Sequence, residues 1–120
     1  MLTILAVDDS ASMRAMVSLT LESAGYNIIS ANDGDQALEK AIESNPDLVL
    51  TDVNMPNMDG ITLIRELRKL PKYKFTPMLM LTTESSAEKK KEGKLAGATG
   101  WLVKPFNPEQ LVATIKRVTS

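Results

Sequence analysis

Apolar residues gather in five short, unbroken runs that polar and turn-forming residues separate. The runs cover residues 3–7, 27–30, 47–51, 77–82 and 99–103. Runs of this length that do not alternate with polar positions are typical of strands buried on both faces of a parallel sheet. The pattern therefore predicts five central strands.

Between the runs, apolar residues recur at the three- and four-residue spacing of one helix face. Capping residues mark the ends, because Asp33, Asp59 and Asn107 precede helical stretches, whereas Gly25 and the pair Asn45-Pro46 follow them. The apolar positions are Met13, Met16, Val17, Leu21 and Ala24, then Ala37, Leu38, Ala41 and Ile42, then Ile64, Leu67 and Leu70, and finally Leu111, Ile115 and Val118.

One further helix is expected over residues 85–97. Ser85 and Glu88 provide a suitable start, but the segment has few apolar anchors before Leu95 and Ala96. A helix with so little apolar surface should be the most loosely held element of the chain.

Strands and helices thus alternate five times along the sequence. This alternation predicts an α/β fold, with a doubly wound five-stranded parallel sheet in the order 2-1-3-4-5 and five flanking helices. The chain is 120 residues long, which suits a single domain over residues 1–120.

Composition narrows the function classes. Lys and Arg number 14 against 15 Asp and Glu, so no basic field indicates a nucleic-acid partner. Cysteine and histidine are absent, which excludes thiolate and imidazole chemistry and leaves Asp, Glu, Ser, Thr and Lys. The start MLTILAVDDS resembles no leader, and no apolar stretch is long enough for a membrane helix, so we expect a cytoplasmic protein.

Carboxylates follow two strands that the predicted order makes neighbours. Asp8 and Asp9 follow the first strand and Asp52 ends the third, at the point where the strand order reverses. Two like charges about 4 Å apart repel by roughly 4 kcal/mol at an effective dielectric near 20, so a cation is needed. Mg²⁺ suits carboxylate and phosphate oxygens, and Lys104 after the fifth strand supplies a fixed positive charge.

Each of these residues also has an ordinary structural interpretation. Asp8 and Asp9 could cap a helix, Asp52 could form a turn, Thr82 is a common strand residue, and a lone Lys104 is usually solvated. Their joint placement at one sheet edge favours a functional site, in which the Thr82 hydroxyl could bond a phosphoryl oxygen.

Five motifs in order resemble the receiver domain of two-component response regulators. They are the acidic pair after the first strand, Asp52 at the end of the third, the MPNMDG that comes soon after it, Thr82 in PMLMLTTES, and KPF within GWLVKPF after the fifth strand. The resemblance covers essentially the whole chain and is closest to the chemotaxis regulators of this family.

The resemblance implies a phosphoacceptor site. Asp52 would take a phosphoryl group from a histidine kinase, in a reaction that the receiver itself catalyses although it is no enzyme in the usual sense. Asp9 and Asp52 would bind Mg²⁺ directly, with Asp8 through water and Asn54 through its backbone carbonyl.

Further roles follow from the same resemblance. Thr82 and Lys104 would contact the phosphoryl oxygens, and a cis peptide is expected between Lys104 and Pro105. Asn54 and Glu84 match positions that tune hydrolysis of the acyl phosphate. Trp101 occupies the position of a switch aromatic that is normally Tyr or Phe, so it either moves inward on activation or is a fixed packing residue.

The expected partners are a histidine kinase, a flagellar motor switch protein or another downstream protein, and a phosphatase, with the chain acting as a monomer. A phosphorelay intermediate outside chemotaxis is the alternative within the family. Two other classes remain open: a small Mg²⁺-dependent phosphohydrolase, for which the chain has no cap segment, and a flavodoxin-like electron carrier, whose FMN phosphate the acids of DDSASM would repel.

Overall fold

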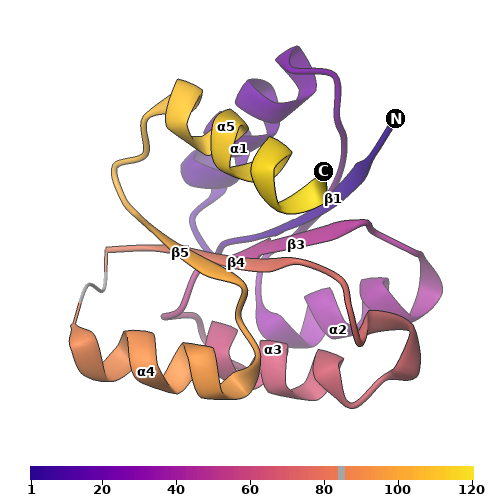
Figure 1. Cartoon of the computed structure of the whole chain (residues 1–120), viewed down its shortest axis with the longest axis vertical. Coiled ribbons are helices and arrows are strands. Elements are labelled where there is room, and N and C mark those ends of the chain that lie inside the picture. Colours follow the sequence, from indigo (N-terminus) through magenta and orange to yellow (C-terminus); the bar gives the residue numbers. More distant parts are fainter. Residues whose placement is uncertain (84–85) are drawn as a thin grey trace.

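The fold is that of a computed structural model, which describes residues 1–83 and 86–120. Its strands and helices alternate along the chain (Figure 1). The strands are β1 (Thr3–Val7), β2 (Asn27–Ala31), β3 (Leu48–Thr51), β4 (Met78–Thr82) and β5 (Gly100–Val103). The helices are α1 (Ala11–Ser23), α2 (Gly34–Glu43), α3 (Gly60–Arg68), the short 3₁₀ helix η1 (Pro71–Tyr73), α4 (Ala87–Ala96) and α5 (Pro108–Thr119).

All five strands form one parallel sheet in the order β2-β1-β3-β4-β5, which confirms the predicted topology. Helices α1 and α5 cover one face, while α2, α3 and α4 cover the other (Figure 1). The register pairs Val7 of β1 with Ala31 of β2 and with Thr51 of β3, so these strands end level with one another. Residues that follow β1 and β3 therefore lie side by side.

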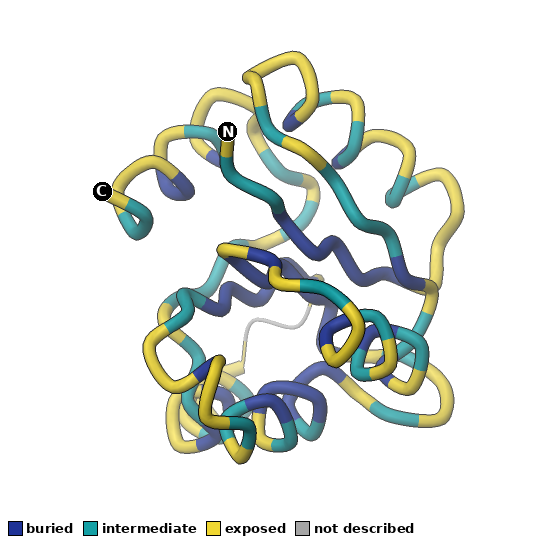
Figure 2. The backbone as a smooth tube through the Cα atoms, turned by 90° about the vertical axis from the view of Figure 1, so that its right-hand side faces the viewer, coloured by how far each residue is buried: buried dark blue, intermediate teal, exposed yellow. Residues whose placement is uncertain are grey.

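The core has two parts because successive strand side chains point to opposite faces of the sheet. Ile4, Leu48 and Leu79 pack toward α1 and α5, whereas Leu5 and Val49 pack toward α2, α3 and α4. The longest buried stretches of the chain, residues 4–8, 48–53 and 78–82, lie along β1, β3 and β4 (Figure 2). Burying a large aliphatic side chain is worth about 1.5–3 kcal/mol, so this two-sided core fixes the strands that carry the site.

Side-chain caps set the helix ends as the sequence predicts. Asp33, Asp59 and Asn107 each accept a hydrogen bond from a backbone N–H in the first turn of their helix. Gly25 follows α1 with φ of 97°, as expected of a residue that ends a helix. Ser85, expected to begin the fourth helix, lies outside the described residues, and Ser86 is the N-cap of α4.

Four residues expected on apolar helix faces are exposed instead, and one of them is Ala24 at the end of α1. The other three are large side chains within helices. Leu95 of α4 is 78% exposed, Ile42 of α2 is 58% exposed and Met16 of α1 is 55% exposed. Each is adjacent in sequence to a buried residue, and one step along a helix turns a side chain by about 100°, away from the sheet. α4 buries only Gly93 and Ala96, in agreement with the expectation of weak anchoring.

The two ends of the chain lie at the sheet edge where the strands begin (Figure 1). Leu2 and Ser120 line the same hollow, together with Asp47 and Pro77, which precede β3 and β4. This edge is opposite the strand ends that Asp8 and Asp52 follow.

None of the helices described is long and apolar enough to cross a bilayer.

Candidate functional site

The carboxylates that follow β1 and β3 converge. Oxygens of Asp8, Asp9 and Asp52 all lie within 4.8 Å of one another, as the strand order predicts. Asp8 and Asp52 are buried, with exposed fractions of 6% and 8%, whereas Asp9 is exposed. Two buried charges beside a third accessible one form a concentrated negative site that solvent can reach from one side.

Lys104 provides the cation of the site. Its Nζ donates to Asp8 Oδ2 at 2.6 Å and to Asp52 Oδ2 at 3.1 Å. Burial by itself would lower the pKa of Lys104, but the hydrogen bonds to Asp8 and Asp52 and their charges outweigh burial and raise that pKa. Lys104 is therefore held as an ammonium ion between the two buried carboxylates.

The backbone around Lys104 directs its side chain into the site. Its N–H donates to the carbonyl of Thr82 at 2.9 Å, in continuation of the β4–β5 ladder. The peptide bond between Lys104 and Pro105 is cis, as the resemblance implied.

The second oxygen of each buried carboxylate is held by the backbone. Asp8 Oδ1 accepts from the N–H of Ser10 at 2.9 Å, and Asp52 Oδ1 accepts from the N–H of Val53 at 2.7 Å. Both carboxylates are thus fixed in orientation before any ligand arrives.

Thr82 ends β4, the strand next to β3, and its side chain is fully buried. Because Thr51 pairs with Met80, continuing the register places Thr82 level with Val53, one residue beyond Asp52. The fold thus brings Thr82 to the same sheet edge as the carboxylates.

The loop between β3 and α3 carries Asn54, which is exposed. Gly60 lets this loop close tightly, because a Cβ at Gly60 would lie 1.9 Å from the carbonyl oxygen of Asp52. Asn57 lies in the same loop with φ of 68°, a left-handed conformation that Asn adopts more readily than most residues.

Two contacts near the site were not predicted from the sequence. Arg14 of α1 donates from Nη1 to the backbone oxygen of Asp8 at 2.6 Å, and Asn57 donates from Nδ2 to Asp33 Oδ2 at 2.9 Å. The only sequence signals were the position of Arg14 early in the helix after the acidic pair and the turn residues around Asn57.

Trp101 pairs with Met80 across β4 and β5 and is half-buried. Its indole Nε1 is buried and has no hydrogen-bond partner among the described residues. The ring packs over α4, where a Cβ on Gly93 would lie 3.5 Å from Trp101 Cζ3. Glu84, expected to tune hydrolysis, lies outside the described residues.

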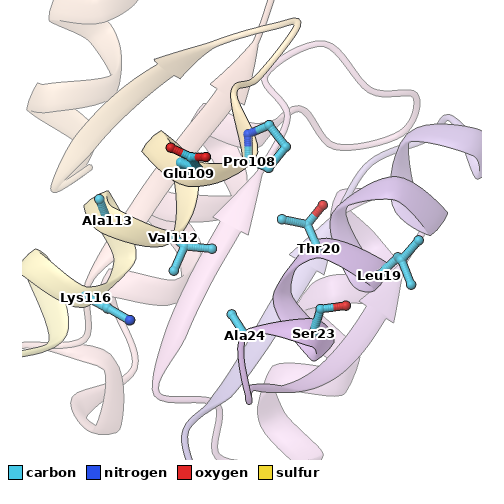
Figure 3. A pocket seen from close by; sticks show the side chains of 9 residues that line it. All are labelled: Leu19, Thr20, Ser23, Ala24, Pro108, Glu109, Val112, Ala113 and Lys116. Carbon is cyan, nitrogen blue, oxygen red and sulfur yellow. The ribbon is translucent and has the colours of Figure 1, made fainter.

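A hollow away from the carboxylates lies between α1 and α5 (Figure 3). It has a volume of about 610 Å³, and Thr20 and Val112 lie on its opposite walls. Glu109 and Lys116 are its charged lining residues, two turns apart on α5. The groove shares no residue with the carboxylate cluster.

The donor atoms at the cluster suit Mg²⁺. They are hard carboxylate oxygens, three of them within 4.8 Å of one another, and Lys104 offsets only part of their charge. A hard divalent cation is therefore a better match than a metal that prefers nitrogen or sulfur ligands.

Comparisons with known proteins agree with this geometry. The family model described as "Response regulator receiver domain" matches residues 4–116. The transcriptional regulatory protein ResD of Bacillus subtilis is 40% identical over 113 residues, which cover 94% of this chain and 46% of that protein. The phosphate regulon regulator PhoB of Pseudomonas aeruginosa is 39% identical, and the match covers 97% of this chain and 51% of PhoB. The chain spans about half the length of the curated relatives it matches.

Solved structures extend the likeness over whole chains. The chemotaxis protein CheY4 of Vibrio cholerae is 58% identical with a TM-score of 0.95, and the match covers 98% of both chains. A CheY-like receiver domain protein from Methanospirillum hungatei is 30% identical with a TM-score of 0.92, covering 98% of this chain and 92% of the other.

Proposed function

Because this chain belongs to the response regulator receiver domain family, we propose that it accepts a phosphoryl group on Asp52 from the phosphohistidine of a histidine kinase. The observation that carries the proposal is the position of the Asp52 carboxylate, which lies against Lys104 and within 4.8 Å of Asp8 and Asp9. A carboxylate in that setting is oriented, desolvated and beside a fixed cation.

The proposed step is an in-line transfer. A carboxylate oxygen of Asp52 forms a bond to phosphorus while the bond from phosphorus to the histidine nitrogen breaks, and the electron pair of that bond stays with the imidazole, which then takes a proton. Phosphoryl transfer depends mainly on positioning and charge neutralisation, and Lys104 supplies a positive charge at this place.

Asp9 and Asp52, the carbonyl of Asn54 and, through water, Asp8 would hold Mg²⁺. When bound, Mg²⁺ neutralises charge on the phosphoryl oxygens. The backbone N–H groups of Ser10 and Val53 already hold Asp8 and Asp52 in fixed orientations, so the chain brings a pre-organised ligand set.

The aspartyl phosphate would act on β4, β5 and α4. The added negative group would draw the Thr82 hydroxyl toward it, and Thr82 joins Lys104 through a backbone hydrogen bond of 2.9 Å. Trp101 lies one strand away and would report the change, while Asn54 and Glu84 would tune the lifetime of the phosphorylated state. Trp101 fluorescence that stays the same after phosphorylation would contradict a moving switch.

The output we favour is a conformational signal to a protein target in chemotaxis, such as a flagellar motor switch protein. The likeness to CheY4 supports it, since both chains are covered almost completely. The relatives ResD and PhoB are named as transcriptional regulators, which supports a function outside chemotaxis and so the alternative of a phosphorelay intermediate. Binding of the phosphorylated chain to a purified motor switch protein would separate the two.

The test of the proposed chemistry is incubation with acetyl phosphate and Mg²⁺, followed by intact mass measurement. The wild-type chain should gain one phosphoryl unit, and Asp52→Asn should gain none. A mass gain in the variant equal to that of the wild type would place the chemistry at another residue. Multiple turnover of a phosphomonoester would favour the phosphohydrolase alternative instead.

A further inference from the structure

The loop of residues 53–59 leaves Asp52 and returns to the same point. The N–H of Gly60 donates to the carbonyl of Val53 at 2.8 Å, and the absence of a side chain at Gly60 lets the backbone approach the carbonyl of Asp52. The base of the loop is therefore closed next to the phosphoacceptor, and the rest of the loop carries Asn54.

The tip of the loop has a tight turn centred on Asn57. The N–H of Met58 donates to the carbonyl of Pro56 at 2.8 Å, and Asn57 has φ of 68°. Asn is among the non-glycine residues that adopt this conformation most readily, so Asn57 suits the turn.

Two contacts with the start of α2 hold the tip. Asn57 Nδ2 donates to Asp33 Oδ2 at 2.9 Å, while Asp33 Oδ1 caps α2 by accepting from the N–H of Gln36 at 2.8 Å. The neighbouring Gly34 leaves room for the loop, because a Cβ there would lie 2.5 Å from the carbonyl oxygen of Met58. The loop is thus docked onto a helix end that is itself fixed.

We infer that Asp33 and Asn57 are positioning residues for the magnesium site, because their hydrogen bond fixes the loop from which Asn54 offers its carbonyl. This inference rests on the proposed function. The hydrogen bonds from Gln36 and Asn57 lower the pKa of Asp33, so its carboxylate is ionised near neutral pH and is a strong acceptor for Asn57.

Two variants remove this contact and preserve the local structure. Asn57→Gly keeps a residue that adopts positive φ freely, and Asp33→Ser keeps a side chain that caps helices well. In each, the dissociation constant of Mg²⁺ measured by calorimetry should rise about tenfold, as is typical when a group that orients a metal ligand is lost. The double variant should bind no more weakly than either single variant, because all three lack the same contact.

A third variant displaces the loop from its other contact. Gly34→Ala puts a Cβ against the Met58 carbonyl, and it should weaken Mg²⁺ binding although Asp33 and Asn57 are both intact. The matched control is Asp35→Asn, which removes an exposed carboxylate from the same first turn of α2 and should leave the dissociation constant within about twofold of the wild type.

Phosphorylation kinetics give a second readout. The Mg²⁺ concentration for half-maximal phosphorylation by acetyl phosphate should rise about tenfold in Asn57→Gly and Asp33→Ser, whereas the rate at saturating Mg²⁺ should stay within about twofold of the wild type.

Wild-type Mg²⁺ affinity in folded Asn57→Gly and Asp33→Ser would overturn the inference and leave the proposed function intact. Loss of the folded state in both variants, seen by circular dichroism, would also overturn it, since the contact would then support the fold rather than the site. A wild-type chain that binds no Mg²⁺ would overturn the proposed function and this inference together.

Discussion

At the scale of single residues, Lys104 has two opposing effects at the site. It stabilises Asp8 and Asp52, from which its Nζ is 2.6 Å and 3.1 Å away, and so makes a buried pair of carboxylates tolerable. The same contacts occupy two oxygens that a metal ion needs. Binding of Mg²⁺ and binding of Lys104 to these oxygens should therefore compete, whereas phosphoryl transfer should need both cations.

Replacing Lys104 separates these effects. In Lys104→Met, Mg²⁺ should bind several-fold more tightly, because two carboxylates lose a competing cation. The rate of phosphorylation at saturating Mg²⁺ should fall about 100-fold, as is common when a group that stabilises developing charge is removed. Calorimetry measures the Mg²⁺ affinity and timed mass spectrometry measures the phosphorylation rate. Lys91→Met, which replaces an exposed lysine of α4, is the control. A variant with both values unchanged would show that Lys104 has no part in the site.

The raised pKa of Lys104 also predicts a pH dependence. A group whose pKa is higher in the folded state contributes stability below its unfolded pKa, here near 10.5, and that contribution is lost as pH rises through the folded value. The free energy of unfolding should therefore fall above about pH 10.5. Burial also raises the pKa of Tyr73, which adds a loss in the same range, so the comparison that isolates Lys104 is wild type against Lys104→Met. The free energy of unfolding is measured by urea titration at several pH values. An equal fall with pH in both proteins would contradict the contribution of Lys104.

At the scale of elements, α4 differs from its neighbour α3. α3 buries Gly60, Ile61, Leu63, Ile64 and Leu67, whereas α4 buries only Gly93 and Ala96. The carboxyl end of α4 is better held than its middle, because Arg68 donates from Nη2 and Nε to the carbonyl of Gly97 at 2.8 Å and 3.1 Å. α4, the helix with less buried apolar surface of the two, is therefore anchored mainly at its carboxyl end.

Substitutions at two glycines would test how the carboxyl end of α4 is held. Gly25 and Gly97 both have positive φ, of 97° and 115°, so Ala at either position should cost about 1–2 kcal/mol in the free energy of unfolding. Gly97→Ala should cost more than Gly25→Ala, since its Cβ would lie 2.8 Å from Arg68 Cγ whereas no atom lies within 4 Å at Gly25. Urea unfolding of the two variants measures the difference in the free energy of unfolding. Equal losses would mean that the Arg68 side chain moves aside without an energetic cost. Hydrogen exchange should also quicken across α4 in Gly97→Ala only.

At the scale of the whole molecule, the strand order brings together groups that are far apart in the sequence. Asp8 and Lys104 are separated by 96 positions, and β3 and β4 lie between β1 and β5 in the sheet. They nevertheless share a hydrogen bond, because both residues follow strands that end at the same edge of the parallel sheet. Binding of a cation at the carboxylate cluster should therefore couple to the stability of the entire domain, since the carboxylates follow different strands.

A thermal melt measures that coupling. At a Mg²⁺ concentration of ten times its dissociation constant, the free energy of unfolding should rise by about 1.4 kcal/mol, which for a domain of this size raises Tm by about 4–6 °C. Asp9→Asn and Asp52→Asn should lose most of this shift, while NaCl at the same ionic strength should produce none in the wild type. A full shift in both variants would place the metal away from the carboxylate cluster.

The strand positions and the strand order could be predicted from the sequence. The predicted runs differ from the observed strands by at most one residue at either end, because strands buried on both faces leave a continuous apolar signature that turn residues interrupt. The proximity of Asp8, Asp9 and Asp52 was also predictable, since strand order alone decides which strand ends are neighbours.

Contacts that depend on side-chain direction were not predictable. The pair Asp33 and Asn57 is 24 positions apart and joins a helix cap to a loop tip, which no periodicity encodes. The only sequence signal for Arg14 is its position early in the helix after the acidic pair, and a solvated residue could occupy the same position. The exposure of Leu95 was missed because α4 has too few apolar residues to show which row faces the sheet.

The placement of Leu2 and Ser120 beside one hollow, at the edge opposite the carboxylates, has a practical consequence. A label, a surface tether or a fused reporter protein joined at either terminus would emerge on the far side of the molecule from the acids. Immobilised in this way, the domain would present the carboxylate cluster outward, and a protein in solution could approach the cluster without meeting the attachment.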